Sequence, residues 1–275
     1  MGVRLLHPPS LGAPRPLEGP ATGGARASDP EDDLARLYAH ELPSPGRAAR
    51  VRANLVATLD GAAAGADGSS RSISGETDLR VLVLLRSLAD VVLVGAGTAR
   101  SEGYGPLAVR PALAARRAAL GQGPAPALAV VTRSGRLPEE LLGGAGRDAA
   151  GAPRVLVAIC AAAGRGALDR LRSSLGDDAV VVAGDDDVDL AAAVAALAAR
   201  GLRRVLCEGG PALLRGVVAA GLLDELCLTT SPLLVAGTGP RALVGDALVE
   251  ELDLASLLLA DDGGGTLLGR WTVRR

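Results

Sequence analysis

Residues 202–213 read LRRVLCEGGPAL, the pattern of a strand that turns directly into a helix. The branched apolar residues of 203–207 are typical of a buried strand, and Pro211 favours the first turn of a helix, where its missing N–H costs nothing. Between them stand Glu208 and the pair Gly209-Gly210, which let the backbone turn sharply and let a ligand approach it closely. The free N–H groups at the start of such a helix suit a pyrophosphate, although a plain strand-to-helix connection has the same pattern.

The alternation of strand and helix patterns extends outward from this stretch. Strands are expected at 51–57, 91–95, 127–132, 154–159, 179–182 and 203–207, and helices at 76–88, 112–120, 162–175, 188–199 and 211–220. This alternation predicts an α/β fold, a three-layer α/β/α sandwich with a mostly parallel sheet. After Asp224 only strand patterns follow, in LCLTTSPLLV, LASLLLA and TLLGRWTV, and they predict an antiparallel C-terminal edge because no helical crossovers separate them.

The first 49 residues differ from the rest, being rich in Pro, Gly and Ala. We interpret residues 1–49 as an N-terminal extension with one short helix at 31–40 and order only near that helix. Residues 50–275 then form the main domain. Within it, 143–153 is expected to be a surface loop.

Composition excludes several classes of protein. The formal net charge is −2, with acids and arginines interspersed, so we expect no nucleic acid partner. No apolar run is long enough for a signal peptide or a membrane span, so we expect no membrane partner and a cytoplasmic location. Because Phe is absent, the core must consist mainly of Leu, Val and Ala.

Metal chemistry is not expected either. Cys160, Cys207 and Cys227 are each flanked by apolar residues, which is typical of buried, reduced thiols. The only histidines, His7 and His40, lie in the N-terminal extension, so neither a zinc motif nor a Ser-His-Asp site can be assembled.

Candidate ligand-binding residues follow the strands, because open α/β sheets bind ligands at the carboxyl ends of their strands. Asp60 ends the first strand in TLDG, a pattern that an ordinary turn shares, and the long loop 61–74 is expected to border a cavity. Arg86, near the end of helix 76–88, either complements the helix dipole or clamps a phosphate. The buried face of this helix is expected to consist of Leu79, Leu82, Val83 and Leu85.

Two further loops have features of cofactor sites. Gly95, Gly97 and Thr98 form a partial glycine-rich loop, but a Rossmann fingerprint needs a third glycine where this chain has Arg100. Residues 132–134, Thr-Arg-Ser, suit the 2′-phosphate that distinguishes NADP from NAD, and they equally suit a polar turn.

Several of these segments stand in the order of a known family. NLVATLDG (54–61), SSRSIS (69–74), LLRSLADVVLVGAGTARSEGYGPLAVR (84–110), VVTRSGRLP (130–138) and VLCEGGPALLRGVVAAGLLDEL (205–226) closely resemble the reductase domain of riboflavin biosynthesis. This is the RibD C-terminal type, which has the dihydrofolate-reductase-like fold. The likeness runs from about residue 50 to the C-terminus, and its specificity lies in the ordered set TLDG, GAGT, EGG and DEL.

The resemblance implies an enzyme that uses NADPH to reduce the ribosylamino group of a pyrimidinone 5′-phosphate to ribitylamino, by hydride transfer to C1′. The residues that would line this small-molecule substrate are Asn54, Ser70, Arg86, Leu107, Arg110 and Glu208, with the two arginines near its phosphate. The residues that would hold NADPH are Ser72, Gly95, Gly97, Thr98, Glu102, Thr132, Arg133, Ser134, Gly209, Gly210, Pro211, Ala212 and Leu213. Asp60 and Glu208 are the candidate catalytic residues, Asp60 as the carboxylate that stabilises a developing iminium or orients a water. A homodimer formed through the C-terminal strands is also implied.

Departures from the family pattern leave alternatives open. The fused zinc deaminase of many relatives is missing, so only reduction is expected. Asn54 stands where relatives often have a basic residue, Ser72 where they often have an aromatic one, and Glu102 replaces the more usual Asp. Tyr104 is the one aromatic residue at hand to stack on a heterocycle. The alternatives are a paralogous reductase of a pterin-like or other imine or carbonyl substrate, and a cofactor-binding protein without turnover.

Overall fold

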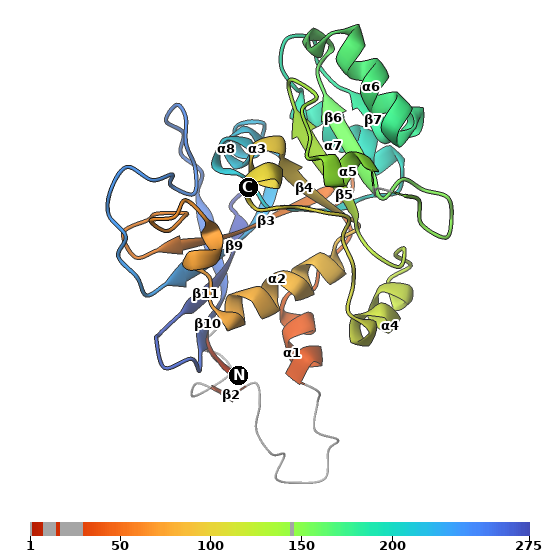
Figure 1. Ribbon diagram of the computed structural model, residues 1–275. Helices are drawn as coiled ribbons and strands as arrows, with labels where there is room; N and C mark the ends of the chain where they lie inside the picture. Colours follow the sequence, from red (N-terminus) through yellow and green to blue (C-terminus); the bar gives the residue numbers. More distant parts are fainter. Residues whose placement is uncertain (1, 8–14, 17–29, 144–145) are drawn as a thin grey trace.

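The computed structural model describes residues 2–7, 15–16, 30–143 and 146–275, which form one sheet between two layers of helices (Figure 1). The strands are β1 (Val3–His7), β2 (Arg15–Pro16), β3 (Arg50–Thr58), β4 (Val91–Gly95), β5 (Ala127–Thr132), β6 (Val155–Ile159), β7 (Val180–Val182), β8 (Arg204–Cys207), β9 (Leu223–Ser231), β10 (Leu252–Ala260) and β11 (Leu267–Val273). The helices are α1 (Pro30–Leu37), α2 (Glu76–Leu88), α3 (Ala96–Ser101), α4 (Pro111–Ala119), α5 (Glu139–Gly143), α6 (Arg165–Leu175), α7 (Leu190–Ala199) and α8 (Pro211–Ala219).

The sheet has a parallel half and an antiparallel half. Its strand order is β2-β1-β10-β11-β9-β3-β8-β4-β5-β6-β7. Every neighbouring pair from β9 to β7 is parallel. Every pair from β9 outward to β2 is antiparallel. The predicted α/β/α sandwich with antiparallel C-terminal strands is therefore confirmed.

The N-terminal segment contributes to the sheet, which the sequence did not predict. Order was expected only near the helix at 31–40, but β1 pairs with β10, so the outer edge is N-terminal. The helix itself, α1, ends at Leu37, and the chain continues as an irregular segment to β3. Residues 1, 8–14 and 17–29 of the expected extension, and 144–145 of the expected surface loop 143–153, lie outside the described residues.

Helices cover the two faces of the sheet unequally. On one face, which we call face A, α1, α2 and α4 pack on the sheet through Leu34, Leu84 and Leu113. On the other, face B, α7 and α8 pack on the parallel half through Leu197 and Val217 (Figure 1). Leu and Val dominate both clusters, as the absence of Phe predicted.

The buried side of α2 differs from the one predicted. Of the four residues expected to face the core, Leu79 is exposed, Leu82 and Val83 are half-buried, and Leu85 alone is fully buried. The buried residues are Thr77, Asp78, Val81, Leu84, Leu85, Ser87 and Leu88. Apolar residues surround most of this helix, so its periodicity allows more than one inward face, and packing against the sheet selects one.

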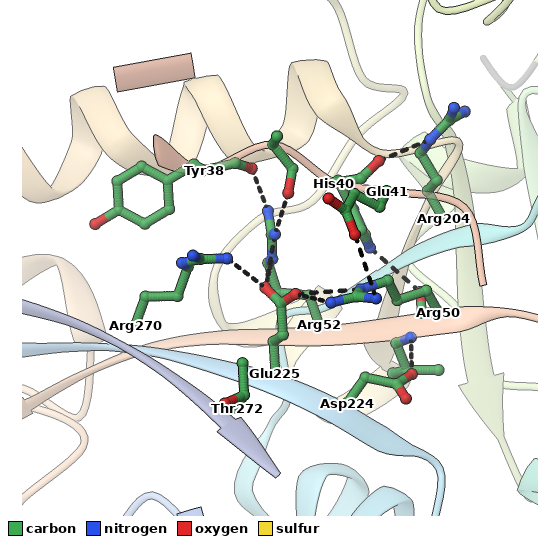
Figure 2. Close-up of polar contacts among 12 residues, drawn as sticks. Tyr38, His40, Glu41, Arg50, Arg52, Arg204, Asp224, Glu225, Arg270 and Thr272 are labelled. Atoms are coloured by element: carbon green, nitrogen blue, oxygen red, sulfur yellow. Dashed lines mark hydrogen bonds and ion pairs between the residues drawn. The ribbon is translucent and has the colours of Figure 1, made fainter. Parts of the chain in front are cut away.

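A buried polar cluster joins the N-terminal segment to face A (Figure 2). Glu225 of β9 accepts hydrogen bonds from Arg52 at 2.7 and 2.9 Å and from Arg50 at 2.5 and 3.1 Å, and Arg270 lies 3.5 Å away. Arg52 also donates to the carbonyl oxygens of Tyr38 and Ala39. Glu225 therefore has a structural role, and so has Asp224, whose carboxylate accepts a hydrogen bond from Val51 N at 2.8 Å.

The three cysteines are free and buried, which confirms their predicted state. Among the described residues, no helix is long and apolar enough to cross a membrane. Within the same ranges no three His, Cys, Asp or Glu side chains gather in a way that could hold a metal ion.

Candidate active site

Glu208 lies at the centre of the candidate site, where β8 ends between β3 and β4. Its backbone N–H donates to Leu93 O at 3.0 Å and so extends the pairing with β4 by one residue. Cys207 pairs in register with Ala53 of β3, which places Asn54 beside Glu208 on the neighbouring strand. Side chains alternate along a strand, and Leu206 packs on face A, so Glu208 projects toward α2.

Arg86 of α2 meets Glu208 in a bidentate ion pair. Its Nε and Nη2 donate to the two carboxylate oxygens at 2.7 and 2.6 Å, and the Glu208 side chain is 3% exposed. Burial on its own lowers the pKa of Arg86, but the hydrogen bonds and charge of Glu208 outweigh it and raise that pKa. The structure therefore brings these two predicted substrate residues together as partners of each other.

Tyr104 completes this group. Its hydroxyl donates to Glu208 Oε2 at 2.5 Å, and the Arg86 guanidinium lies over its ring, 5.3 Å from the ring centre. Burial, followed by the negative charge of Glu208, raises the pKa of Tyr104. Sequence analysis considered this residue only for stacking on a heterocycle, but one face of its ring is covered by Arg86.

Glycines let two helix N-termini approach each other next to this group. Gly95 N donates to Gly209 O at 2.8 Å, which joins the start of α3 to the start of α8. Gly209 has φ +76°, and the Gly209–Gly210 peptide bond is cis. A Cβ on Gly210 would lie 2.4 Å from Thr98 Oγ1, so the approach requires glycine at this position.

At the start of α8, the backbone offers donors that the helix does not use. Leu214 N is the first to bond within the helix, to Gly210 O, so the N–H groups of Ala212 and Leu213 precede the helical ladder. Pro211 has no N–H, and it occupies the first helical position as predicted. Gly97, exposed, lies in the first turn of α3 nearby.

Glu102 holds the loop that follows β3. Its carboxylate accepts hydrogen bonds from Ser70 N at 3.0 Å, Ser70 Oγ at 3.1 Å and Ser69 Oγ at 3.2 Å. Ser72, in the same short turn, has its hydroxyl 2.7 Å from Asp67 Oδ1. The structure thus joins Ser70 with Glu102, two residues that the resemblance assigned to different ligands.

The remaining predicted residues make no hydrogen bond or ion pair with Glu208, Arg86 or Tyr104 among the described residues. Thr132 is buried and accepts a hydrogen bond from Gly135 N, whereas Arg133 and Ser134 are exposed. Leu107 is buried, and its carbonyl oxygen accepts from Arg154. Arg110 is exposed at the N-cap of α4, and its side chain has no hydrogen bond or ion pair with another described residue.

Asp60 is bound to a different loop from Glu208. Its carboxylate accepts from Val235 N at 3.2 Å, from Ala236 N at 2.7 Å and from the Thr58 hydroxyl. The hydrogen bond from Thr58, and after it that from Ala236, lowers the pKa of Asp60. β3 extends five residues past the Ala53–Cys207 pair, roughly 16 Å of strand, so Asp60 and Glu208 share the carboxyl edge but stand at different heights.

Two cavities lie outside this group of residues. One of about 360 Å³ lies on face B between α8, β9 and residues 243–252. Another, of about 890 Å³, opens at the amino ends of β4 to β6, next to Asp90, Arg117 and Arg154. Neither is lined by the loop 61–74, so a cavity at that loop stays a prediction.

The chain has clear relatives. The profile of the RibD C-terminal domain matches residues 49–268. The 2,5-diamino-6-ribosylamino-4(3H)-pyrimidinone 5′-phosphate reductase of Methanothermobacter thermautotrophicus is 32% identical over 224 residues, which are 80% of this chain and 96% of that protein. The reductase of the same name from Archaeoglobus fulgidus is 28% identical and is covered over 94% of its length.

Solved structures agree with this likeness. A pyrimidine reductase-like protein from Corynebacterium diphtheriae superimposes with a TM-score of 0.73 at 28% identity, covering 82% of this chain and 92% of that one. The riboflavin biosynthesis reductase of Saccharomyces cerevisiae gives a TM-score of 0.59 at 13% identity, covering 90% and 100%. At that identity the second likeness concerns the fold alone.

Proposed function

The chain belongs to the RibD C-terminal domain family and has its dihydrofolate-reductase-like fold, and from this we propose that it is an NADPH-dependent reductase of riboflavin biosynthesis. It reduces the ribosylamino group of a pyrimidinone 5′-phosphate to ribitylamino by hydride transfer to C1′. Relatives named for the reduction of such a phosphate, matched over nearly their whole length, support the proposal. The observation that carries it is the junction of Glu208, Arg86 and the glycine-lined start of α8 in one place.

The residues around α8 fit the cofactor. The N–H groups of Ala212 and Leu213 and the positive end of the helix dipole suit a pyrophosphate, and Gly210 leaves the backbone open to it. The other residues assigned to NADPH are Ser72, Gly95, Gly97, Thr98, Glu102, Thr132, Arg133, Ser134, Gly209 and Pro211. When bound, NADPH supplies the hydride for the reduction.

The substrate then lies on face A beside Glu208. Asn54, next to Glu208 in register, and Ser70 offer neutral polar groups, and Leu107 an apolar one. Arg110 has no partner in the described chain, which leaves its guanidinium for the phosphate. Arg86 uses Nε and Nη2 on Glu208, and its Nη1 remains for the same phosphate.

The two carboxylates have separate roles in this proposal. Glu208, held by Arg86, contacts the substrate at the end of β8. Asp60, whose pKa is lowered chiefly by the hydrogen bond from Thr58, stays ionised and acts as a fixed anion that stabilises developing positive charge or orients a water.

The test is NADPH oxidation by the purified protein with 2,5-diamino-6-ribosylamino-4(3H)-pyrimidinone 5′-phosphate, with the ribitylamino product identified by mass spectrometry. We expect one product molecule for each NADPH consumed. Turnover of a pterin or another imine instead would support a paralogous reductase. NADPH binding with no turnover on a pyrimidine and pterin panel would refute the reductase assignment.

We also propose that the protein is a cytoplasmic homodimer formed through face B of β9, β10 and β11. The apolar side chains of this face that are half-buried yet belong to no core cluster of the described residues include Leu228, Leu254, Leu257, Leu259, Leu267 and Trp271. An apolar surface of this kind favours contact with a second copy. Light scattering should give a dimer mass for the wild type and a monomer mass for Leu257→Arg, and a monomeric wild type would contradict the proposal.

A further inference from the structure

Tyr104 is held rigidly in the turn after α3. Its backbone N–H donates to Ala99 O at 2.9 Å, and the preceding Gly103 has φ +65°, which reverses the chain there. Its ring packs against the face A core. The ring therefore enters the site at a defined angle, with its hydroxyl directed at Glu208.

Among the residues that the structure describes, Arg86 and Tyr104 alone donate hydrogen bonds to the Glu208 carboxylate. Oε1 accepts from Arg86 Nε, and Oε2 accepts from both Arg86 Nη2 and the Tyr104 hydroxyl. A buried carboxylate needs such partners, because an ion without them loses its hydration without compensation. Two of its three donors belong to Arg86, and the third is a neutral group.

The two donors differ in what a phosphate does to them. A substrate phosphate that binds at the remaining Nη1 draws the Arg86 guanidinium toward itself and so weakens its hold on Glu208, since both are anions that favour its forked geometry. The phosphate attracts the Tyr104 phenol less strongly, because that hydroxyl carries no charge. Burial raises the pKa of Tyr104, so the phenol stays protonated and remains a donor.

We propose that Tyr104 is a positioning residue that acts through Glu208. It keeps the carboxylate at the end of β8, beside Asn54, when Arg86 engages the substrate phosphate. This inference rests on the proposed function for the identity of the substrate. This positioning role needs both parts of the Tyr104 side chain. The ring lies under the Arg86 guanidinium, and the hydroxyl donates to the Glu208 carboxylate.

The variant that isolates the hydroxyl is Tyr104→Phe, which keeps the ring under Arg86. One hydrogen bond to a charged group contributes enough to expect kcat to fall roughly tenfold or more. The dissociation constant of NADPH, measured by fluorescence, should stay unchanged, and the melting temperature should fall by a few degrees at most, with the variant still folded. Tyr38→Phe is the matched control, because Tyr38 is the other tyrosine of the chain, is 1% exposed and packs in the same face A core.

The outcomes separate this inference from the proposed function. If the wild type turns over and Tyr104→Phe matches Tyr38→Phe in kcat, the positioning role is wrong and the reductase assignment remains. If the wild type does not turn over, crystal structures of the wild type and Tyr104→Phe, each with inorganic phosphate bound at Arg86, decide. A displaced Glu208 carboxylate in the variant supports the positioning role, and an unmoved one overturns it.

Discussion

Replacing Glu225 by Gln should destabilise the protein strongly at neutral pH. Its side chain is 1% exposed and accepts four hydrogen bonds of 3.1 Å or less from Arg50 and Arg52. Burial on its own raises the pKa of Glu225, but the charge of Arg52 and the hydrogen bonds from Arg50 lower it from 4.5 to about 2. A shift of this size corresponds to about 3 kcal/mol in the free energy of unfolding, at about 1.4 kcal/mol per pKa step.

The loss of charge also leaves the buried guanidinium of Arg52 without the anion it pairs with, although the carbonyl oxygens of Tyr38 and Ala39 and the amide oxygen of Gln still accept hydrogen bonds. Breaking a buried pair from one side costs about 3–5 kcal/mol. The two estimates agree, so we expect the free energy of unfolding to fall by about 3–5 kcal/mol near pH 7. The N-terminal segment is the first part of the fold that should loosen, because the same arginine holds residues 38–39.

The pH dependence follows from the sign of the shift. A carboxyl group whose folded pKa is depressed stabilises the fold fully above its unfolded pKa, here 4.5, and the stabilisation is lost as the pH falls through about 2. The difference between wild type and Glu225→Gln should therefore be constant above about pH 5.5 and shrink steadily between about pH 4.5 and 2.

Urea unfolding followed by circular dichroism, repeated across this pH range, measures the difference. Asp253→Asn is the matched control, because Asp253 also pairs with an arginine, Arg274, but both side chains are more than half exposed. It should leave the unfolding midpoint unchanged. A Glu225→Gln effect no larger than that of the control, or one that does not vary with pH, would refute the reasoning.

Three further predictions concern the site and the buried histidine. Gly210→Ala should weaken NADPH binding at least tenfold in a fluorescence titration, because the added Cβ would lie 2.4 Å from Thr98 Oγ1. The control is Gly239→Ala, where nothing lies within 4 Å of the added Cβ, and equal NADPH affinities of the two variants would contradict the proposed cofactor site. Arg110→Ala should raise KM for the phosphorylated substrate at least tenfold and leave the NADPH dissociation constant unchanged, and equal effects on both would argue against a phosphate contact. Burial, followed by the charge of Arg52, lowers the pKa of His40 well below 6.5, so its ring should show no titration by NMR between about pH 6 and 8; a midpoint near 6.5 would show that the ring is accessible.

Local patterns of the sequence were sufficient for much of the fold. Strand and helix periods placed β3 to β8 and the helices α2, α4, α6, α7 and α8 within a few residues, because an element that buries one or both faces must repeat that pattern in its own sequence. The short helices α3 and α5 were not predicted, since five or six residues are too few to show a helical period. The order of β8, Glu208, two glycines and α8 was equally readable, since turn chemistry depends on residues that are adjacent in the chain.

Contacts between distant residues were not readable. Arg86 and Glu208 are 122 residues apart, and each had an acceptable local role, so nothing in either segment indicated that they pair. The same holds for Asp60 and the amides of Val235 and Ala236, 175 and 176 residues further on. Tyr104 could be singled out from the sequence, because aromatic residues make up only 1% of the chain. Its partners, Arg86 and Glu208, could not be predicted from that rarity.

By itself, then, the sequence determined the elements, their alternation and the family-like order of the segments that end the strands. The tertiary structure alone decided that the N-terminal strand closes the sheet edge on β10, which face of α2 is buried, and that Arg86, Tyr104 and Glu208 form one group. The physical reason is that propensity and periodicity depend on residues a few positions apart. The pairing of strand edges, helix faces and buried charges depends instead on residues that are distant in the sequence and meet only in the folded chain.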